Sequence, residues 1–98
     1  MFARVTPFKM KPDSRKEAEE IMTRVKDQIM GLQGMQHFVC TMNDDGSGYI
    51  FALLTSKEES ETNQPRVKEI WANFAHLLEK QPRAEGFDVV RDWVKEPA

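Results

Sequence analysis

Residues 35–55 read MQHFVCTMNDDGSGYIFALLT, which is two apolar runs separated by a cluster of turn-forming residues. Asn, Asp and Ser favour tight turns because their side chains bond the local backbone, and Gly does so because it tolerates a positive φ. The flanking runs are rich in the apolar, aromatic and β-branched residues typical of strands. We therefore expect strands over residues 35–43 and 49–55, joined as an antiparallel hairpin.

Two further segments carry apolar residues at helical spacing. The first has them at Ala18, Ile21, Met22, Val25, Ile29 and Leu32, and the second at Val67, Ile70, Trp71, Phe74, Leu77 and Leu78. At 100° per residue each set forms one stripe about 120° wide, as in a helix that buries a single face. The sequence predicts a first helix over residues 14–32 and a second helix that stops before Pro82.

Capping residues refine the boundaries of these helices. Ser14 and Ser56 each precede a Glu by three residues, which is the spacing of a capping box. The second box predicts a short helical turn over residues 57–62. Asn63 and Pro65, which come next, are typical of a fresh helix start.

Strand-like runs also occupy both ends of the chain, over residues 2–10 and 87–94. The predicted order is therefore strand, helix, strand, strand, helix, strand. This order is typical of an α+β, ferredoxin-like βαββαβ fold, in which a four-stranded antiparallel sheet carries two helices on one face. A chain of 98 residues fits one domain, and we expect a single domain over residues 1–98.

The sheet face away from the helices is expected to be apolar as well. The run 50–54 is apolar at both parities, and Phe87 and Trp93 oppose Val90 and Val94 on the last strand. A bare face of this kind exceeds the roughly few hundred Å² of apolar surface that soluble monomers usually expose. A second copy packed sheet to sheet would cover it, and we predict a homodimer. The alternatives are a strand that is merely central, or a C-terminal tail that acts as the cover.

Composition argues against several classes of function. The formal net charge of −2 gives no basic footprint for nucleic acid. No apolar stretch approaches the length of a membrane span, and the N-terminus lacks the apolar run of a signal peptide. Cys40 is the single cysteine, so an internal disulfide is excluded and a cytoplasmic location is favoured. His37 and Cys40 fall on opposite strand faces, and we expect neither a metal nor a cofactor.

Three short motifs resemble those of the dimeric α/β-barrel proteins, especially the ones similar to antibiotic biosynthesis monooxygenases. Lys11-Pro12-Asp13 resembles the Lys-Pro-Gly that precedes the family's first helix, with Asp in place of Gly. Gln33-Gly34-Met35 resembles its Pro-Gly-Phe, and Leu54-Thr55-Ser56 stands where many members carry Trp-x-Ser. The resemblance covers nearly the whole chain and implies a dimeric α/β barrel.

Members of this family range from cofactor-independent oxygenases of aromatic polyketides, through heme-degrading enzymes, to proteins with no assigned activity. The resemblance therefore implies a cofactor-independent monooxygenase acting on a small aromatic or quinol-type molecule. The alternative is a non-catalytic small-ligand-binding or interaction module. The heme degraders space a Trp and a His further apart than Trp71 and His76, which fall on different helix faces here. Heme degradation is therefore not expected.

Few residues are candidates for chemistry. His37 on the second strand is a candidate general base, since an imidazole exchanges protons near neutral pH. The alternative for His37 is a histidine satisfied by a backbone carbonyl or by water near the sheet edge. Polar or aromatic character on the strands makes five further candidates for a ligand pocket: Arg4, Thr6, Tyr49, Arg91 and Trp93. For the arginines the alternative is a carboxylate partner at a sheet end. We expect the site between the sheet and the helices, or on the face that the partner covers.

Overall fold

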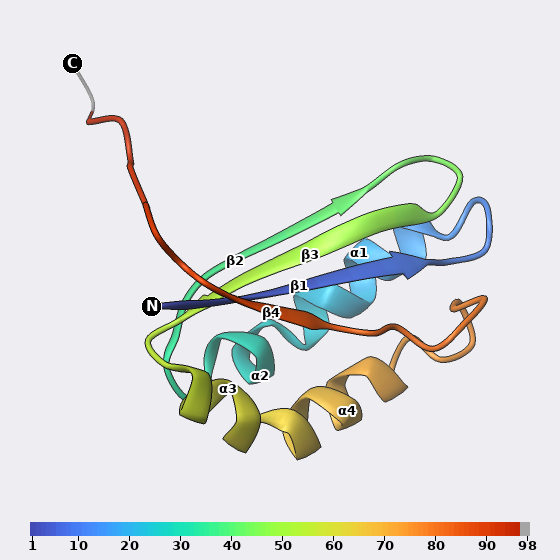
Figure 1. Ribbon diagram of the computed structural model, residues 1–98. Helices are drawn as coiled ribbons and strands as arrows, with labels where there is room; N and C mark the ends of the chain where they lie inside the picture. Colours follow the sequence, from blue (N-terminus) through green and yellow to red (C-terminus); the bar gives the residue numbers. More distant parts are fainter. Residues whose placement is uncertain (97–98) are drawn as a thin grey trace.

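The computed structural model describes residues 1–96, which form strands and helices in the order strand, helices, strand, strand, helices, strand (Figure 1). They are β1 (Phe2–Lys9), α1 (Arg15–Arg24), α2 (Lys26–Met30), β2 (Met35–Met42), β3 (Ser47–Leu54), α3 (Lys57–Thr62), α4 (Gln64–Ala72) and β4 (Glu85–Asp88). The sheet has the strand order β2-β3-β1-β4, and each neighbouring pair is antiparallel. The helices lie on one side of the sheet in Figure 1, which confirms the predicted ferredoxin-like arrangement.

The β2–β3 hairpin closes through hydrogen bonds inside its turn. The Asn43 N–H donates to the Ser47 carbonyl at 2.8 Å, and the Asp45 carboxylate accepts from the Ser47 N–H at 3.0 Å and from its hydroxyl at 2.6 Å. The hydrogen bond from this hydroxyl is the main reason that the pKa of Asp45 lies below its ordinary value. Gly46 takes a φ of +90°, which residues with a Cβ rarely adopt. The predicted turn is confirmed, although β3 begins two residues earlier than the sequence predicted.

The first predicted helix is interrupted. α1 ends at Arg24, Val25 has a φ of −101° and a ψ of 10°, and α2 begins at Lys26. The apolar stripe continues through the break, because Ile21, Val25 and Ile29 all belong to the core. Periodicity located the buried face and missed the break, since a change at one residue leaves the stripe on the same side.

Of the two serines predicted to cap a helix, only Ser56 makes the side-chain capping bond. Ser56 has an extended backbone, and its side chain accepts a hydrogen bond from the Glu59 N–H at 3.1 Å. Ser14 has helical angles instead and makes no capping bond, so that prediction is wrong. The turn before α1 is set by Asp13, whose φ is +66°. Asp tolerates this left-handed conformation better than most residues, so Asp13 can stand where the resembling motif has Gly.

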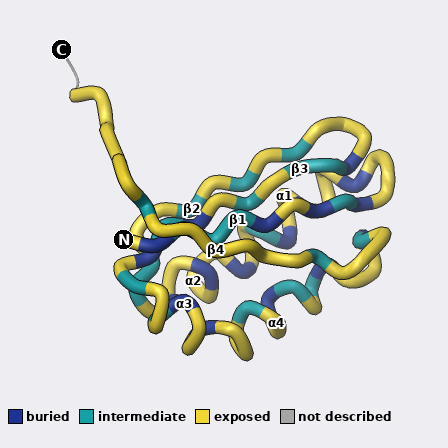
Figure 2. The backbone as a smooth tube through the Cα atoms, viewed as in Figure 1, coloured by how far each residue is buried: buried dark blue, intermediate teal, exposed yellow. Residues whose placement is uncertain are grey.

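The core lies between the sheet and the helices. Its fully buried residues are Phe8, Met10, Ala18, Ile21, Val25, Ile29, Leu32, Ile70, Phe74 and Leu77. Figure 2 shows buried positions along β1 and on the helices, whereas most of the hairpin turn and of the segment after β4 is exposed. No helix within the described residues has the length and apolar character needed to cross a bilayer.

The last strand begins earlier and ends earlier than predicted. β4 spans Glu85–Asp88, whereas the sequence predicted a strand over 87–94. β4 pairs only with β1, and the pair at its end joins Asp88 to Phe2, where β1 begins. None of the strands in residues 1–96 lies beside residues 90–94, so these residues leave the sheet as an extended tail (Figure 1).

The open face of the sheet, on the side away from the helices, is apolar. Tyr49 and Phe51 stack there with ring centroids 6.0 Å apart, and Val39 and Phe87 are also exposed on this face. The tail does not cover it, since the Trp93 side chain is 86% exposed. The sequence correctly predicted a second apolar face. The alternative in which the C-terminal tail covers this face is contradicted.

Asn63 joins the two halves of the chain. Its Oδ1 accepts from the Gln33 N–H at 3.0 Å, and its Nδ2 donates to the Gln33 carbonyl at 2.9 Å. The buried amide thereby ties the α3–α4 junction to the loop between α2 and β2. Asn63 occupies the N-cap position of α4, as predicted, but its side chain makes no capping bond to that helix.

We expect Asn63→Ala to lower the free energy of unfolding by about 2–3 kcal/mol, because both backbone groups of Gln33 lose their partner. Asn73→Ala is the matched control, since its amide bonds only carbonyls of its own helix, at 3.1 and 3.3 Å. That change should cost about 0.5 kcal/mol. Urea denaturation measures both losses, and equal losses would contradict the joining role of Asn63.

Candidate functional site

A cavity of about 650 Å³ lies between the sheet and the helices. Helix-facing side chains of β1, β2 and β3 form its floor, the helices form its roof, and residues 81–84 border it just before β4. Much of the lining is apolar and includes Phe8, Met22, Met35, Phe38, Ile50 and Phe74. The volume lies within the range of roughly 300–1,000 Å³ that is usual for small-molecule sites.

The strand register sets the charged part of the floor. Arg4 on β1 lies directly opposite Ala52 on β3 and opposite Gly86 on β4, so its long side chain stands between two small residues. A Cβ at position 86 would lie only 2.3 Å from Cζ of Phe2, so a larger residue there would displace that ring. Arg4 is half-buried and has no carboxylate within ion-pair distance in the part of the chain that the structure describes. Its guanidinium is therefore available to a ligand.

The next row of the floor carries a hydroxyl and a thiol. Thr6 on β1 is opposite Ile50 on β3, which is opposite Cys40 on β2, and all three line the cavity. Burial raises the pKa of the Cys40 thiol, and the negative charge of Glu19 adds to this effect. Cys40 is therefore a neutral thiol near neutral pH and a weak nucleophile.

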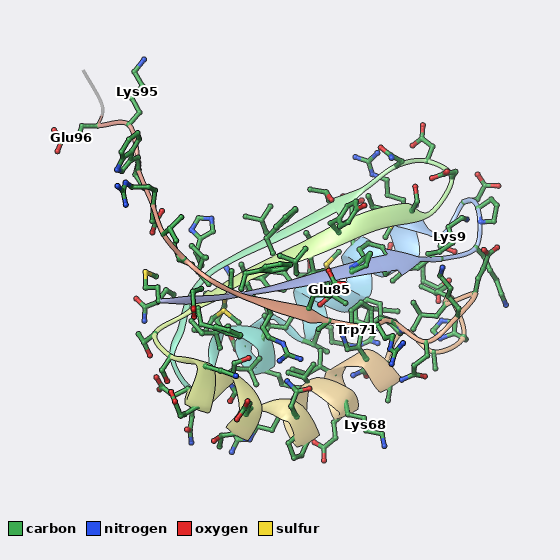
Figure 3. The ribbon with its side chains drawn as sticks, in the orientation of Figure 1. Lys9, Lys68, Trp71, Glu85, Lys95 and Glu96 are labelled. Atoms are coloured by element: carbon green, nitrogen blue, oxygen red, sulfur yellow. The ribbon has the colours of Figure 1, made fainter. Side chains whose placement is uncertain are left out.

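Helix α4 supplies an aromatic roof. The Trp71 ring centroid lies 6.1 Å from that of Phe8 and 5.9 Å from that of Phe74. Figure 3 shows Trp71 on the side of α4 toward the sheet, whereas Lys68 on the same helix points away from it. Lys68 therefore lines the cavity with its hydrocarbon stem and keeps its ammonium in solvent. His76 is exposed and does not line the cavity, in agreement with its predicted place off the apolar stripe.

The structure brings two of the predicted site residues, Arg4 and Thr6, together in the cavity. His37 lies on the open face of the sheet, in the row of Leu53. Tyr49 lies on that face as well, where it borders a second hollow of about 260 Å³. Catalytic or binding roles for His37 and Tyr49 stay predictions that require a cover over this face.

The other two predicted site residues, Arg91 and Trp93, lie in the exposed tail after β4. The Arg91 guanidinium donates to the carbonyl of its neighbour Val90 at 2.6 Å. Neither residue lines the cavity within the chain that carries it. A ligand role for them therefore requires contact with a second chain.

The predicted set of site residues did not include the polar residues of the roof. Ser60 on α3 and Gln64 at the start of α4 both line the cavity. Helical periodicity does reach Ser60, because steps of seven residues lead from Phe74 through Val67 to position 60. This position was missed because the helical stripe was traced through apolar residues alone. Among residues 1–96, no three His, Cys, Asp or Glu side chains gather closely enough to hold a metal ion.

We expect Cys40 to be alkylated slowly, because its raised pKa leaves little thiolate at neutral pH. The rate of reaction with iodoacetamide should rise with pH and reach its midpoint at a higher pH in the folded protein than in urea. Mass spectrometry of samples quenched over time measures both rates. A folded protein that reacts as fast as the unfolded one at neutral pH would contradict this environment for Cys40.

Comparisons with protein-family models and with curated proteins give no match. Solved structures do match. One is a monooxygenase from the gene ActVA-Orf6 of Streptomyces coelicolor, in complex with the ligand nanaomycin D, with a TM-score of 0.74 and 19% identity over 97% of this chain and 92% of that one. Another is NE2512 of Nitrosomonas europaea, a protein of unknown function, with a TM-score of 0.77 and 12% identity over 98% and 95% of the two chains.

A third structure, described as an antibiotic biosynthesis monooxygenase, gives a TM-score of 0.73 at 7% identity, over 93% of this chain and 100% of that one. At identities this low the likeness concerns the path of the backbone and not the side chains of a site. The match nevertheless spans nearly the whole of each chain. The protein therefore has the fold of the antibiotic biosynthesis monooxygenase-like proteins, the family that its short motifs resemble.

Proposed function

We propose that the protein binds a small aromatic or quinol-type molecule in this cavity and oxidises it as a cofactor-independent monooxygenase. The observation that carries the proposal is a cavity of about 650 Å³ whose largely apolar lining includes the half-buried Arg4. Apolar walls with a few polar groups are typical of small-molecule sites. The rings of Trp71 and Phe8 provide aromatic surfaces against which a planar ligand can pack.

Arg4 would prepare a phenolic substrate for oxidation. A cation beside a phenol lowers the pKa of its hydroxyl, and the released proton would pass to water. The phenolate is rich in electrons and can react with O₂ directly. A phenol with a free para C–H plus O₂ gives a para-quinone plus water, so one oxygen atom becomes the new carbonyl and the other leaves with two hydrogens. This balance needs no external reductant, and the apolar walls limit water around reactive intermediates.

The solved structures support the proposal by analogy. The similar Streptomyces coelicolor protein is a monooxygenase solved with a ligand bound, nanaomycin D. Its fold extends over nearly the whole of the present chain. Because one fold hosts many activities, this likeness raises the expectation of an oxygenase without assigning a role to any side chain.

A second candidate function, non-catalytic binding of the same class of ligand, is favoured by one specific observation. Within the described part of the chain, the lining of the cavity contains no His, Asp or Glu, and Cys40 is held as a neutral thiol. A proton transfer inside the cavity would therefore have no evident general base. The candidate base His37 lies on the opposite face of the sheet.

We further propose that the functional unit is a homodimer packed through the open sheet faces. That face presents Val39, Tyr49, Phe51 and Phe87, each at least about 39% exposed in the single chain. Water contact with such a surface is unfavourable, and its burial by a second copy would stabilise both chains. The unpaired tail over residues 90–94 carries further apolar side chains that would gain a partner in the same assembly.

In light scattering at micromolar concentration we expect a mass of about twice 11.4 kDa. Phe51→Lys should shift the protein toward monomer, because it places a charge in the centre of the open face. Met30→Lys is the control, since Met30 is 43% exposed but lies on α2 rather than on that face. A wild-type monomer, or dissociation of both variants alike, would rule out this interface.

For the ligand, we expect naphthols and naphthalene diols to raise the Tm of the wild-type protein. Arg4→Met should weaken their binding roughly tenfold or more, as expected for loss of a charged hydrogen-bond partner. Arg15→Met is the control, because Arg15 pairs with Asp44 at 3.4 Å and does not line the cavity. An oxygen electrode then separates the two candidates. Substrate-dependent O₂ uptake supports the oxygenase, and tight binding without uptake supports the binding module.

A further inference from the structure

Ser60 carries a buried hydroxyl on α3. The residue is 2% exposed and lines the cavity, and its Oγ has no hydrogen-bond partner among residues 1–96. Buried polar side chains nearly always have a partner, and one left without costs free energy relative to Ala at the same place. The stability of the fold does not explain why this position holds a serine. The unpaired hydroxyl therefore suggests a hydrogen-bond partner outside the chain.

Ser60 lacks a hydrogen bond that other hydroxyls in the helices of this protein make. A hydroxyl inside a helix usually bonds the carbonyl four residues before it. Thr62 on the same helix bonds the Glu58 carbonyl at 2.9 Å, and Thr23 on α1 bonds the Glu19 carbonyl at 3.0 Å. Ser60 makes no such bond, so its side chain can turn about χ1 toward a ligand without breaking a hydrogen bond.

Other polar groups of this part of the roof are already engaged. The Asn63 amide is held by the backbone of Gln33, through bonds of 3.0 and 2.9 Å. The Gln64 amide donates to the backbone carbonyl of Ser60 at 3.2 Å, which leaves the Ser60 hydroxyl itself without a role. Ser60 is therefore the hydroxyl that this roof can offer to a bound molecule.

Ser60 and Arg4 stand at different points of one cavity. α3 follows directly on Leu54, so Ser60 belongs to the end of the sheet where Leu54 pairs with Phe2 and with Met35. Arg4 lies one row further along the floor, opposite Ala52. A ligand with two separate oxygen functions could therefore offer one to the cation and the other to the hydroxyl.

We propose that Ser60 is a specificity-determining residue that hydrogen-bonds a hydroxyl or carbonyl oxygen of the ligand, while Arg4 pairs with an oxyanion on another part of its ring system. This inference rests on the proposed function, because it uses the same cavity. The ligand class is then an aromatic molecule with an anionic oxygen and a second oxygen substituent. A ring with only the anionic oxygen fits the cavity and leaves Ser60 unpaired.

The test uses two stable probes, 1-naphthoate and 4-hydroxy-1-naphthoate, which differ by one hydroxyl across the ring from the carboxylate. We expect the wild-type protein to bind the hydroxy compound about fivefold more tightly in calorimetry, the value of one hydrogen bond. Ser60→Ala should bind both compounds equally, with the affinity for 1-naphthoate unchanged. The Tm of the unliganded variant should stay the same or rise, because an unpaired buried hydroxyl is removed. Thr62→Ala is the control and should keep the preference.

Two results would overturn this inference and leave the proposed function standing. One is Ser60→Ala that binds both probes with the wild-type preference, while Arg4→Met weakens both. The other is an unliganded Ser60→Ala whose Tm falls by several degrees, which would show that the hydroxyl supports the fold. If neither naphthoate binds the wild-type protein at millimolar concentration, both this inference and the proposed oxyanion site of Arg4 are wrong.

Discussion

The pairing of β1 with β3 on one side and β4 on the other is the constraint on which the site depends. Side chains alternate across a strand, so this register sends Arg4 and Thr6 toward the helices and Val5 toward the open face. A slip of one residue would exchange these two sets and leave the cavity without its cation. Packing resists the slip, because the ring of Phe2 occupies the space beside Gly86 that a side chain would otherwise fill.

The same alternation leaves the single chain with an incomplete core. The helix-facing side of the sheet is covered, yet it encloses a cavity of about 650 Å³, and the open side carries exposed apolar rings. Unfilled space costs dispersion contacts, and a chain of this size buries only about two thirds of its unfolded surface. A ligand inside and a second copy outside would therefore each stabilise the fold, and the two effects act on opposite faces of one sheet.

The features that were predicted correctly from the sequence are those determined by local sequence pattern. The turn at 43–48 and the stripes of both helical segments depend on residues close in the chain, so they can be recognised without knowing the rest. The end of β4 could not be predicted in this way. Residues 90–94 have strand-like composition, and they leave the sheet because β1 offers no backbone beside them. Strand length depends on the partner, which single-sequence patterns do not contain.

The same distinction between local pattern and tertiary contacts applies to the candidate site. The position of Arg4 and Thr6 on the helix-facing side could be predicted because parity on a strand fixes their face, whereas the closure of the cavity by α3 and α4 decides which polar groups meet them. Asn63 shows the difference most clearly. Its place before Pro65 is typical of a helix cap, yet its amide is used by Gln33, thirty residues away in the chain. The Asn63 side chain bonds a residue distant in the sequence instead of the first turn of its own helix, and nothing near Asn63 in the sequence indicates this.

The chemistry of the lining also limits which substrates the proposed oxidation would suit. A cavity lined by a cation and neutral groups, without a carboxylate or an imidazole, can stabilise an anion but cannot efficiently create one from a weak acid. Among phenols, those conjugated with a carbonyl bring the most acidity of their own, so binding beside Arg4 would ionise them most completely. Where the second oxygen on the ring system belongs to such a carbonyl, it contributes to that acidity and is also a group that the unpaired hydroxyl of Ser60 would recognise. The electrostatics of the floor and the hydrogen-bonding capacity of the roof thus favour the same class of molecule.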